Sequence, residues 1–305
     1  MSESRVPVAV MLLFIMAVQV LALALTPAIF ATGNRVFEDP ASNYNPFYYV
    51  VLILAFTGFL LLAMRLKRGW IVGGFIQLSI AASIYYVLAA FLPLLLALLA
   101  TLAVMLLLRY YPEWYIIDAF GIVVCAGISA LFGVSMDPLP ALVLLVILAV
   151  YDAISVYKTR HMVSLAEGVI KMKAPLLFVV PKSRDYSFRK EHFTGSGSGS
   201  GMGSGSASVS TDSSKDRGRR GAFFLGLGDA IIPTILVISA YIAFPGSEIF
   251  GVGYPAAGAM LGTYLGFLLL MTTSRDRPQA GLPFLNSGVI LGFLAGCLAA
   301  GIQPI

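Results

Sequence analysis

Nine apolar runs, each close to the length needed to cross a membrane, dominate the sequence. They cover residues 7–31, 47–64, 70–91, 93–108, 115–134, 138–157, 221–243, 249–272 and 283–303. About 20 apolar residues in a helix span the hydrocarbon core of a bilayer. Since 59% of the residues are apolar and only 11% are charged, the composition is not that of a soluble globular domain. We therefore expect an all-α, multi-pass membrane protein with nine transmembrane helices.

The positions of lysine and arginine predict how these spans are oriented. In a nine-span arrangement, all of these basic residues except Arg35 fall on one side of the membrane. The positive-inside rule makes that side cytoplasmic, so we expect a cytoplasmic amino terminus and an extracytoplasmic carboxy terminus. The net charge of +5 then reflects topology, and we expect no nucleic-acid partner.

The long segment between the sixth and seventh runs predicts how the chain is organised. Residues 1–157 form a six-span block, residues 158–220 a cytoplasmic linker and residues 221–305 a three-span block. Much of the linker is rich in glycine and serine and lacks the GK[ST] of a phosphate-binding loop, which is typical of a flexible tether. The β-branched run LLFVV, at 176–180, precedes the tether and is a candidate for pairing with an extended peptide as an added strand.

Three aspartates lie inside the apolar runs: Asp118, Asp152 and Asp229. An ionisable group at membrane depth costs roughly 2.5 to 3.5 kcal/mol on insertion scales, so its default interpretation is functional. Asp118 follows Trp114 closely, and we interpret it as a snorkelling or helix-end charge at the interface. Asp152 and Asp229 lie at similar depths on adjacent spans, so their carboxylates are predicted to meet.

A carboxylate pair at that depth is suited to acid–base chemistry. Two like charges a few ångströms apart in a low dielectric cannot both ionise, so the pair shares a proton. One carboxylate can then deprotonate a water while the other polarises a peptide carbonyl. The alternatives are a proton-coupled transporter or cation-leak channel that uses the same aspartates, and a non-catalytic scaffold. Neither HExxH nor GxSxG is present, and we expect no metal or cofactor.

Two motifs surround these aspartates. They are YD, at Tyr151 and Asp152, and GLGD, at Gly226, Leu227, Gly228 and Asp229. With nine spans and both motifs in order, the chain resembles the GxGD intramembrane aspartyl proteases, the presenilin and signal peptide peptidase superfamily. The resemblance implies a presenilin-like bundle and Asp152 and Asp229 as the catalytic pair. It also implies an aspartic endopeptidase that cleaves transmembrane protein or peptide substrates in the bilayer; oligomeric state stays open.

The family's third motif, PAL, is expected at the start of the ninth run. The matching residues are Ala280, Gly281 and Leu282, followed by Pro283, so the motif departs at its first two positions. The resemblance implies that these residues position the substrate, and the backbone before Pro283 is a second candidate for pairing with an extended peptide. The GLGDAIIP stretch resembles signal peptide peptidase whereas the orientation resembles presenilin, a mixture that is similar to archaeal homologues of presenilin.

Overall fold

The computed structural model describes nearly all of the apolar part of the chain. The described residues are 5–33, 35–37, 39–65, 69–111, 113–155, 177–181, 222–246, 249, 251–273 and 281–304. Ala280 and the Gly/Ser-rich tether lie outside them, as does most of the linker at 158–220. The division into two blocks joined by that linker stays a prediction.

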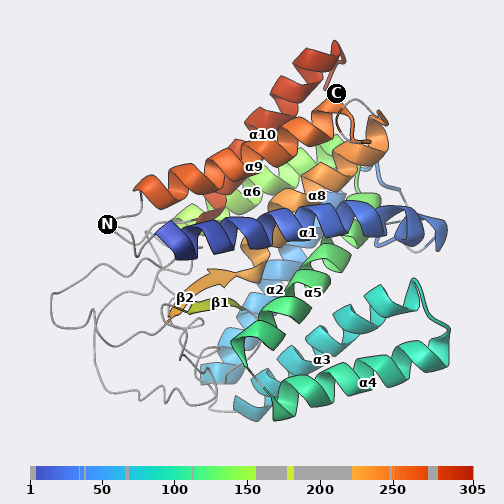
Figure 1. Ribbon diagram of the computed structural model, residues 1–305, viewed down its shortest axis with the longest axis vertical. Coiled ribbons are helices and arrows are strands. Elements are labelled where there is room, and N and C mark those ends of the chain that lie inside the picture. Colours follow the sequence, from blue (N-terminus) through green and yellow to red (C-terminus); the bar gives the residue numbers. More distant parts are fainter. Residues whose placement is uncertain are drawn as a thin grey trace, which may run out of the picture.

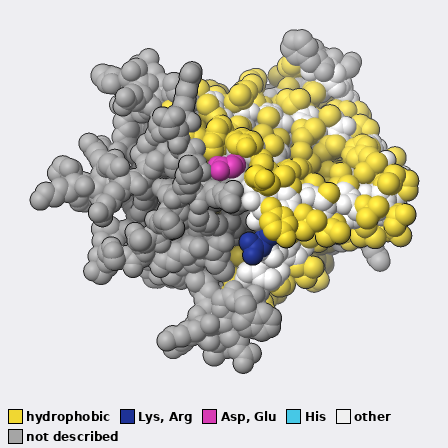
Figure 2. Space-filling model, turned by 60° about the horizontal axis from the view of Figure 1, so that its bottom comes forward, with side chains coloured by type: hydrophobic (Ala, Val, Ile, Leu, Met, Phe, Trp, Pro, Cys, Tyr) yellow, Lys and Arg dark blue, Asp and Glu magenta, His cyan; other side chains and the backbone are white. Residues whose placement is uncertain are grey.

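Nine apolar helices in the described part of the chain lie where the nine spans are predicted, so the predicted fold class is confirmed. They are α1 (Arg5–Ala31), α2 (Asn45–Arg65), α3 (Gly69–Ala89), α4 (Leu94–Tyr110), α5 (Trp114–Val134), α6 (Pro138–Ile154), α8 (Leu227–Ala243), α9 (Tyr254–Thr273) and α10 (Gly281–Ala300). By length and composition, α1, α3, α5, α9 and α10 are able to cross a membrane, and the other four carry shorter apolar stretches. Figure 2 shows apolar side chains over most of the described part of one face.

The seventh span begins differently from the prediction. Residues 221–243 are predicted as one helix, but Ala222–Gly226 form a strand, β2, and α8 begins only at Leu227. This strand pairs antiparallel with β1 (Leu177–Pro181), and Val179 lies opposite Phe224. A short run of aromatic and aliphatic residues suits a buried strand as well as a helix, and its pairing partner decides between them.

The helices pack into a bundle, and the small sheet lies at one side of it, below α1 in the view of Figure 1. A core cluster joins α1, β1, α8 and α9 through Ile15, Phe178, Leu227 and Phe267, all buried. At one edge of the bundle, α9 and α10 lie side by side so closely that a Cβ at Gly262 would collide with the carbonyl oxygen of Gly288. At the opposite edge, α3 and α4 form an antiparallel pair. The β1–β2 sheet therefore lies at one side of the bundle, packed against α5 and α1 and next to the start of α8.

Candidate active site

Asp152 lies in the last turn of α6 and faces the interior of the bundle. Its residue surface is only 4% exposed, and its Oδ2 accepts a hydrogen bond of 3.3 Å from the backbone N–H of Leu282. Tyr151, the other residue of the YD motif, is half-buried beside it. The YD motif and the region matched to PAL, which are 130 residues apart in the chain, therefore meet in the fold.

Asp229 lies in the first turn of α8 and is 7% exposed. Helix α8 packs against α6, and the carboxyl groups of Asp229 and Asp152 are close enough for direct electrostatic repulsion. Two carboxylates that the sequence places on adjacent spans are thus together in the structure. Such a pair is able to share a proton, as an acid and a base acting on one substrate must.

The GLGD motif lies at the junction where strand β2 passes into helix α8. Gly226 ends β2 and precedes α8 with extended backbone angles of −65° and 135°. A Cβ at Gly226 would lie only 2.9 Å from Oδ2 of Asp229, so a glycine at this position leaves room for the carboxylate. Leu227 is buried in the core cluster, whereas Gly228 is exposed and a Cβ there would meet nothing within 4 Å. The chain thus turns from strand to helix with open space beside Gly228.

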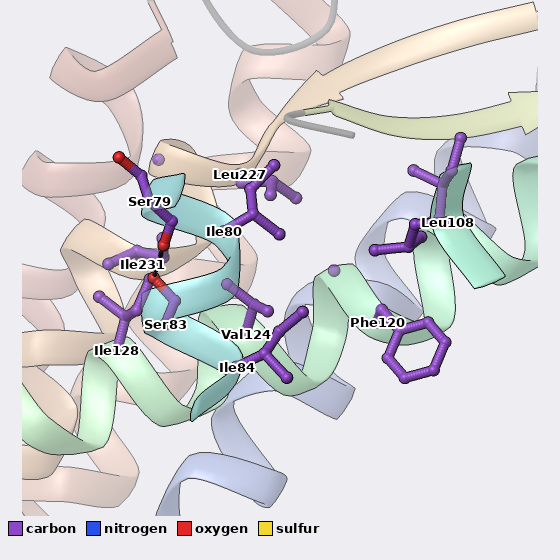
Figure 3. Close-up of a pocket in the computed structure, with 13 residues that line it drawn as sticks. Ser79, Ile80, Ser83, Ile84, Leu108, Phe120, Val124, Ile128, Leu227 and Ile231 are labelled. Carbon is purple, nitrogen blue, oxygen red and sulfur yellow. Dashed lines mark hydrogen bonds between the residues drawn. The ribbon is translucent and has the colours of Figure 1, made fainter. Parts of the chain in front are cut away.

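That open space is a cavity of about 280 Å³ between α3, α4, α5 and α8. Figure 3 shows apolar side chains around it, with the hydroxyl-bearing Ser79 and Ser83 one turn apart on α3. Ser83 Oγ donates a 2.9 Å hydrogen bond to the Ser79 carbonyl. A second cavity of about 560 Å³, which reaches Tyr49 of α2, shares Ser79, Ser83 and Gly228 with the first. A largely apolar space therefore leads along the bundle to the residue before Asp229.

The first turn of α10 holds the residues matched to PAL. Gly281 is buried, Leu282 donates its N–H to Asp152, and Pro283 stands in the first helical turn, where no N–H is needed. One turn further, Asn286 Nδ2 donates a 2.8 Å hydrogen bond to the carbonyl of Leu145 in α6. Two hydrogen bonds therefore tie the start of α10 to the helix that carries Asp152. Sequence reasoning missed Asn286, although a buried amide in an apolar span is itself a signal.

Asp118 does not snorkel towards a surface, as one interpretation of its position near Trp114 predicts. It is 3% exposed, and its Oδ1 accepts a 2.7 Å hydrogen bond from the N–H of Val179 in β1. The strand LLFVV is likewise less available to a substrate than expected. One edge of β1 is paired with β2. On the other edge, the Asp118 carboxyl group accepts the hydrogen bond of the Val179 N–H, which the pairing with β2 does not use. The Leu282 N–H, just before Pro283, is bonded to Asp152 as well.

Comparisons with known proteins identify the family and the fold of the chain. Residues 11–302 match the family described as "Signal-peptide peptidase, presenilin aspartyl protease". The chain belongs to this family. It is similar to two solved structures, both described as a presenilin family intramembrane aspartate protease, in the C222 and P2 space groups. The first is 32% identical over 96% of this chain and 98% of that chain, and the second 33% identical over 95% and 96%; the TM-score is 0.64 for both. No curated protein matches the chain.

Membership of the presenilin and signal-peptide peptidase family makes the chain an intramembrane aspartyl protease, an aspartic endopeptidase of membrane proteins. It also confirms an integral, multi-pass membrane protein with substrates in the bilayer. The alternative of a transporter or leak channel gains no support from the family or from the matched structures.

Proposed function

We propose that Asp152 and Asp229 are the catalytic pair of this protease and act on peptide bonds within transmembrane segments. The observation that carries the proposal is the burial of both carboxyl groups, on the packed helices α6 and α8, within range of mutual electrostatic repulsion. Burial of both groups favours a shared proton over two full negative charges. A proton shared by the pair supplies an acid and a base at the same peptide bond.

The chemistry follows from the two protonation states. The ionised carboxylate takes a proton from a water, whose oxygen attacks the carbonyl carbon of the scissile bond. The protonated carboxyl group donates a hydrogen bond and then its proton to the carbonyl oxygen, which gives a tetrahedral intermediate. When the intermediate collapses, the C–N bond breaks and the amide nitrogen receives a proton from the carboxyl group that had deprotonated the water. A hydroxyl of the intermediate returns its proton to the other carboxylate, which restores the shared proton. The products are a new carboxyl and a new amino terminus.

We further propose that an extended stretch of substrate adds to the outer edge of β2. A helical peptide bond is shielded by its own helix, so the substrate must unwind before hydrolysis. Among the described residues, β2 has a strand neighbour on one side only, and it leads through Gly226 into the turn that carries Asp229. A strand added there would receive main-chain hydrogen bonds beside the carboxyl pair. Deletion of residues 175–180 without loss of cleavage would contradict this view.

The apolar cavities suit the part of the substrate that stays in the membrane. They are lined mainly by aliphatic and aromatic side chains, and they border Gly228, the neighbour of Asp229. A largely apolar lining favours an apolar segment over a polar one, because it offers few partners for buried polar groups. We propose that the substrate's transmembrane segment occupies this space while the unwound part reaches the carboxyl pair.

The proposed orientation places the amino terminus and the linker in the cytoplasm. The asymmetry of lysine and arginine supports it. Both native cysteines, Cys125 and Cys297, are buried, so introduced cysteines can be labelled selectively. A membrane-impermeant thiol reagent should label Asn43→Cys from outside intact cells, and Tyr111→Cys only after permeabilisation. The reverse pattern would invert the topology.

The catalytic assignment is tested by incubating the purified protein with a single-span substrate and sequencing the products by mass spectrometry. Asp152→Asn and Asp229→Asn should each abolish cleavage while the protein stays folded, since neither carboxylate can replace the other. Ser129→Ala, a substitution of another buried polar side chain in the bundle, is the matched control and should retain cleavage. Cleavage at a comparable rate by either Asn variant would reject the pair.

A further inference from the structure

Asp118 is a buried carboxyl group that the proposed chemistry does not use. It lies on α5, its Oδ1 accepts the Val179 N–H at 2.7 Å, and its Oδ2 is buried with no hydrogen-bond partner among the described residues. A carboxyl group held at that depth is costly, and it bonds the backbone of a strand 61 residues further along the chain. The bond therefore links α5 to the sheet and to no other described group.

The direction of this bond shows which edge of β1 it occupies. Neighbouring residues of a strand point their N–H groups to opposite edges, so residues 177, 179 and 181 share one edge. Because the Val179 N–H is bonded to Asp118, this edge is turned away from β2, and the ladder to β2 uses Phe178 and Val180. Pro181, on the same outer edge, has no N–H. Asp118 thus fills the middle of the outer edge of β1.

A second contact one turn along α5 fixes the same strand. Gly121 lies under the ring of Phe178: a Cβ there would be 3.1 Å from Cε1 of Phe178 and 3.4 Å from Cδ2 of Leu227. On the other face of the strand, Val179 packs against Ile117, which precedes Asp118 in α5. One segment of α5 therefore holds β1 by a hydrogen bond, by a close ring contact and by side-chain packing. It also contacts Leu227, which lies between β2 and Asp229.

The position of β1 is passed on to the site through β2. The register places Leu177 opposite Gly226 and Phe178 opposite Leu225, at the end of β2 that continues into the first turn of α8. A shift of β1 along or away from α5 would move this end of the ladder. Any substrate strand aligned on the sheet would then present a different peptide bond to the carboxyl pair. A substrate register set by the sheet would therefore depend on this contact with α5.

We infer that Asp118 is a positioning residue, which fixes the β1–β2 sheet on α5 and so sets which peptide bond of the substrate is cleaved. The inference rests on the proposed function of Asp152 and Asp229 and of the outer edge of β2. Asp118 itself acts on the substrate only through β1 and β2. It is therefore distinct from the catalytic pair, although all three aspartates are buried in the same bundle.

The test compares three substitutions at the two ends of the bond. Asp118→Ala removes the acceptor, Val179→Pro removes the donor, and Asp118→Asn keeps an acceptor oxygen. Proline is tolerated at the outer edge of a strand, because its missing N–H removes no bond of the ladder there. The residue before a proline must have an extended backbone, and Phe178, as part of strand β1, has one. Measured on a single-span substrate, Asp118→Ala and Val179→Pro should each lower kcat by on the order of 10- to 100-fold. Both should also spread cleavage over neighbouring peptide bonds, whereas Asp118→Asn should cleave at the wild-type position.

Two further variants separate positioning from general loss of structure. The double variant Asp118→Ala with Val179→Pro should be no slower than either single variant, because both remove one bond. Ser129→Ala is the matched control: it is buried on the same helix and its Oγ donates to the carbonyl of Ile231 at 3.3 Å, so its removal leaves the sheet anchored. It should cleave at the wild-type position.

Several results would overturn the inference. Wild-type rate and wild-type cleavage position in Asp118→Ala would show that the bond has no effect on presentation. Additive losses in the double variant would show that the two residues act separately. Complete inactivity of Asp118→Asn, equal to that of Asp152→Asn, would place Asp118 among the reacting groups. Cleavage by Asp152→Asn and Asp229→Asn, run in the same series, would instead sink the proposed catalytic pair, whatever Asp118 does.

Discussion

The two glycines before Asp229 differ in what a side chain would meet. At Gly226 a Cβ would press against the Asp229 carboxylate at 2.9 Å, whereas at Gly228 it would enter open space bordering the cavities. Neither glycine is required by a left-handed backbone conformation, because neither Gly226 nor Gly228 has a positive φ angle. The motif therefore combines one glycine that protects the carboxylate with one that borders the proposed path of the substrate.

This difference predicts opposite outcomes for the same substitution. Gly226→Ala should lower kcat by on the order of 100-fold, because it displaces the Asp229 carboxylate of the proposed catalytic pair. Gly228→Ala should fold normally and change kcat only a few-fold. Gly228→Leu, in which the side chain projects into the cavity, should raise KM much more than it lowers kcat. Initial rates over a range of substrate concentrations decide this, and equal effects of alanine at both positions would contradict the account.

Among single residues, the sequence predicts the aspartates of the two motifs because an ionisable group in an apolar run stands out. It does not predict the role of Asp118, whose partner is a backbone N–H in β1, 61 residues away. Proximity to Trp114 predicts a snorkelling or helix-end charge, whereas the carboxyl group is in fact buried against the sheet. Hydrogen bonds to a distant backbone leave no pattern in the composition or spacing of the residues that make them.

At the scale of elements, two hydrogen bonds connect α10 to α6. Leu282 bonds Asp152, and one turn later Asn286 bonds the Leu145 carbonyl, two turns before Asp152. The second bond lies between transmembrane helices, where such bonds average about 0.6 kcal/mol and reach about 1.7 kcal/mol. Its effect on stability is therefore modest, but it fixes the height of α10 relative to the aspartate.

Asn286→Leu should accordingly affect activity more than stability. We expect the free energy of unfolding to fall by about 1 kcal/mol and kcat to fall on the order of 10-fold, because Leu282 no longer sits opposite Asp152. Thr263→Val is the control, since the Thr263 hydroxyl is buried but bonds only its own helix, at the Ala259 carbonyl. It should leave kcat unchanged. A loss of activity no greater than that of the control would remove Asn286 from the positioning of α10.

The start of the seventh span shows where prediction at this scale ends. The sequence AFFLG at 222–226 is apolar throughout, so it has neither the alternation of a half-buried strand nor the period of an amphipathic helix. Its strand conformation depends on pairing with residues 177–181, which are separated from it by 40 intervening residues. The positions of the other spans are predictable from the sequence, because the length of an apolar span and the polar residues that bound it are set by the membrane and not by a pairing partner.

At the scale of the whole molecule, the bundle brings three separated segments to one point. Helix α6 supplies Asp152, the junction of β2 and α8 supplies Asp229, and the start of α10 contacts Asp152. The apolar cavities reach the same point from the side of α3 and α5. A membrane-embedded protease needs the carboxyl pair, a place for an apolar segment and an edge for an unwound one, and this arrangement provides each of them.

The central claim is that Asp152 and Asp229 act together on one tetrahedral intermediate. It is tested most directly by the dissociation constant of a peptidomimetic with a hydroxyl in place of the scissile carbonyl, measured for the wild type, Asp152→Asn, Asp229→Asn and the double variant. A transition-state analogue binds across both groups, so each single variant should lose affinity by on the order of 100-fold, with little further loss in the double variant. Wild-type affinity in either single variant would contradict a shared site.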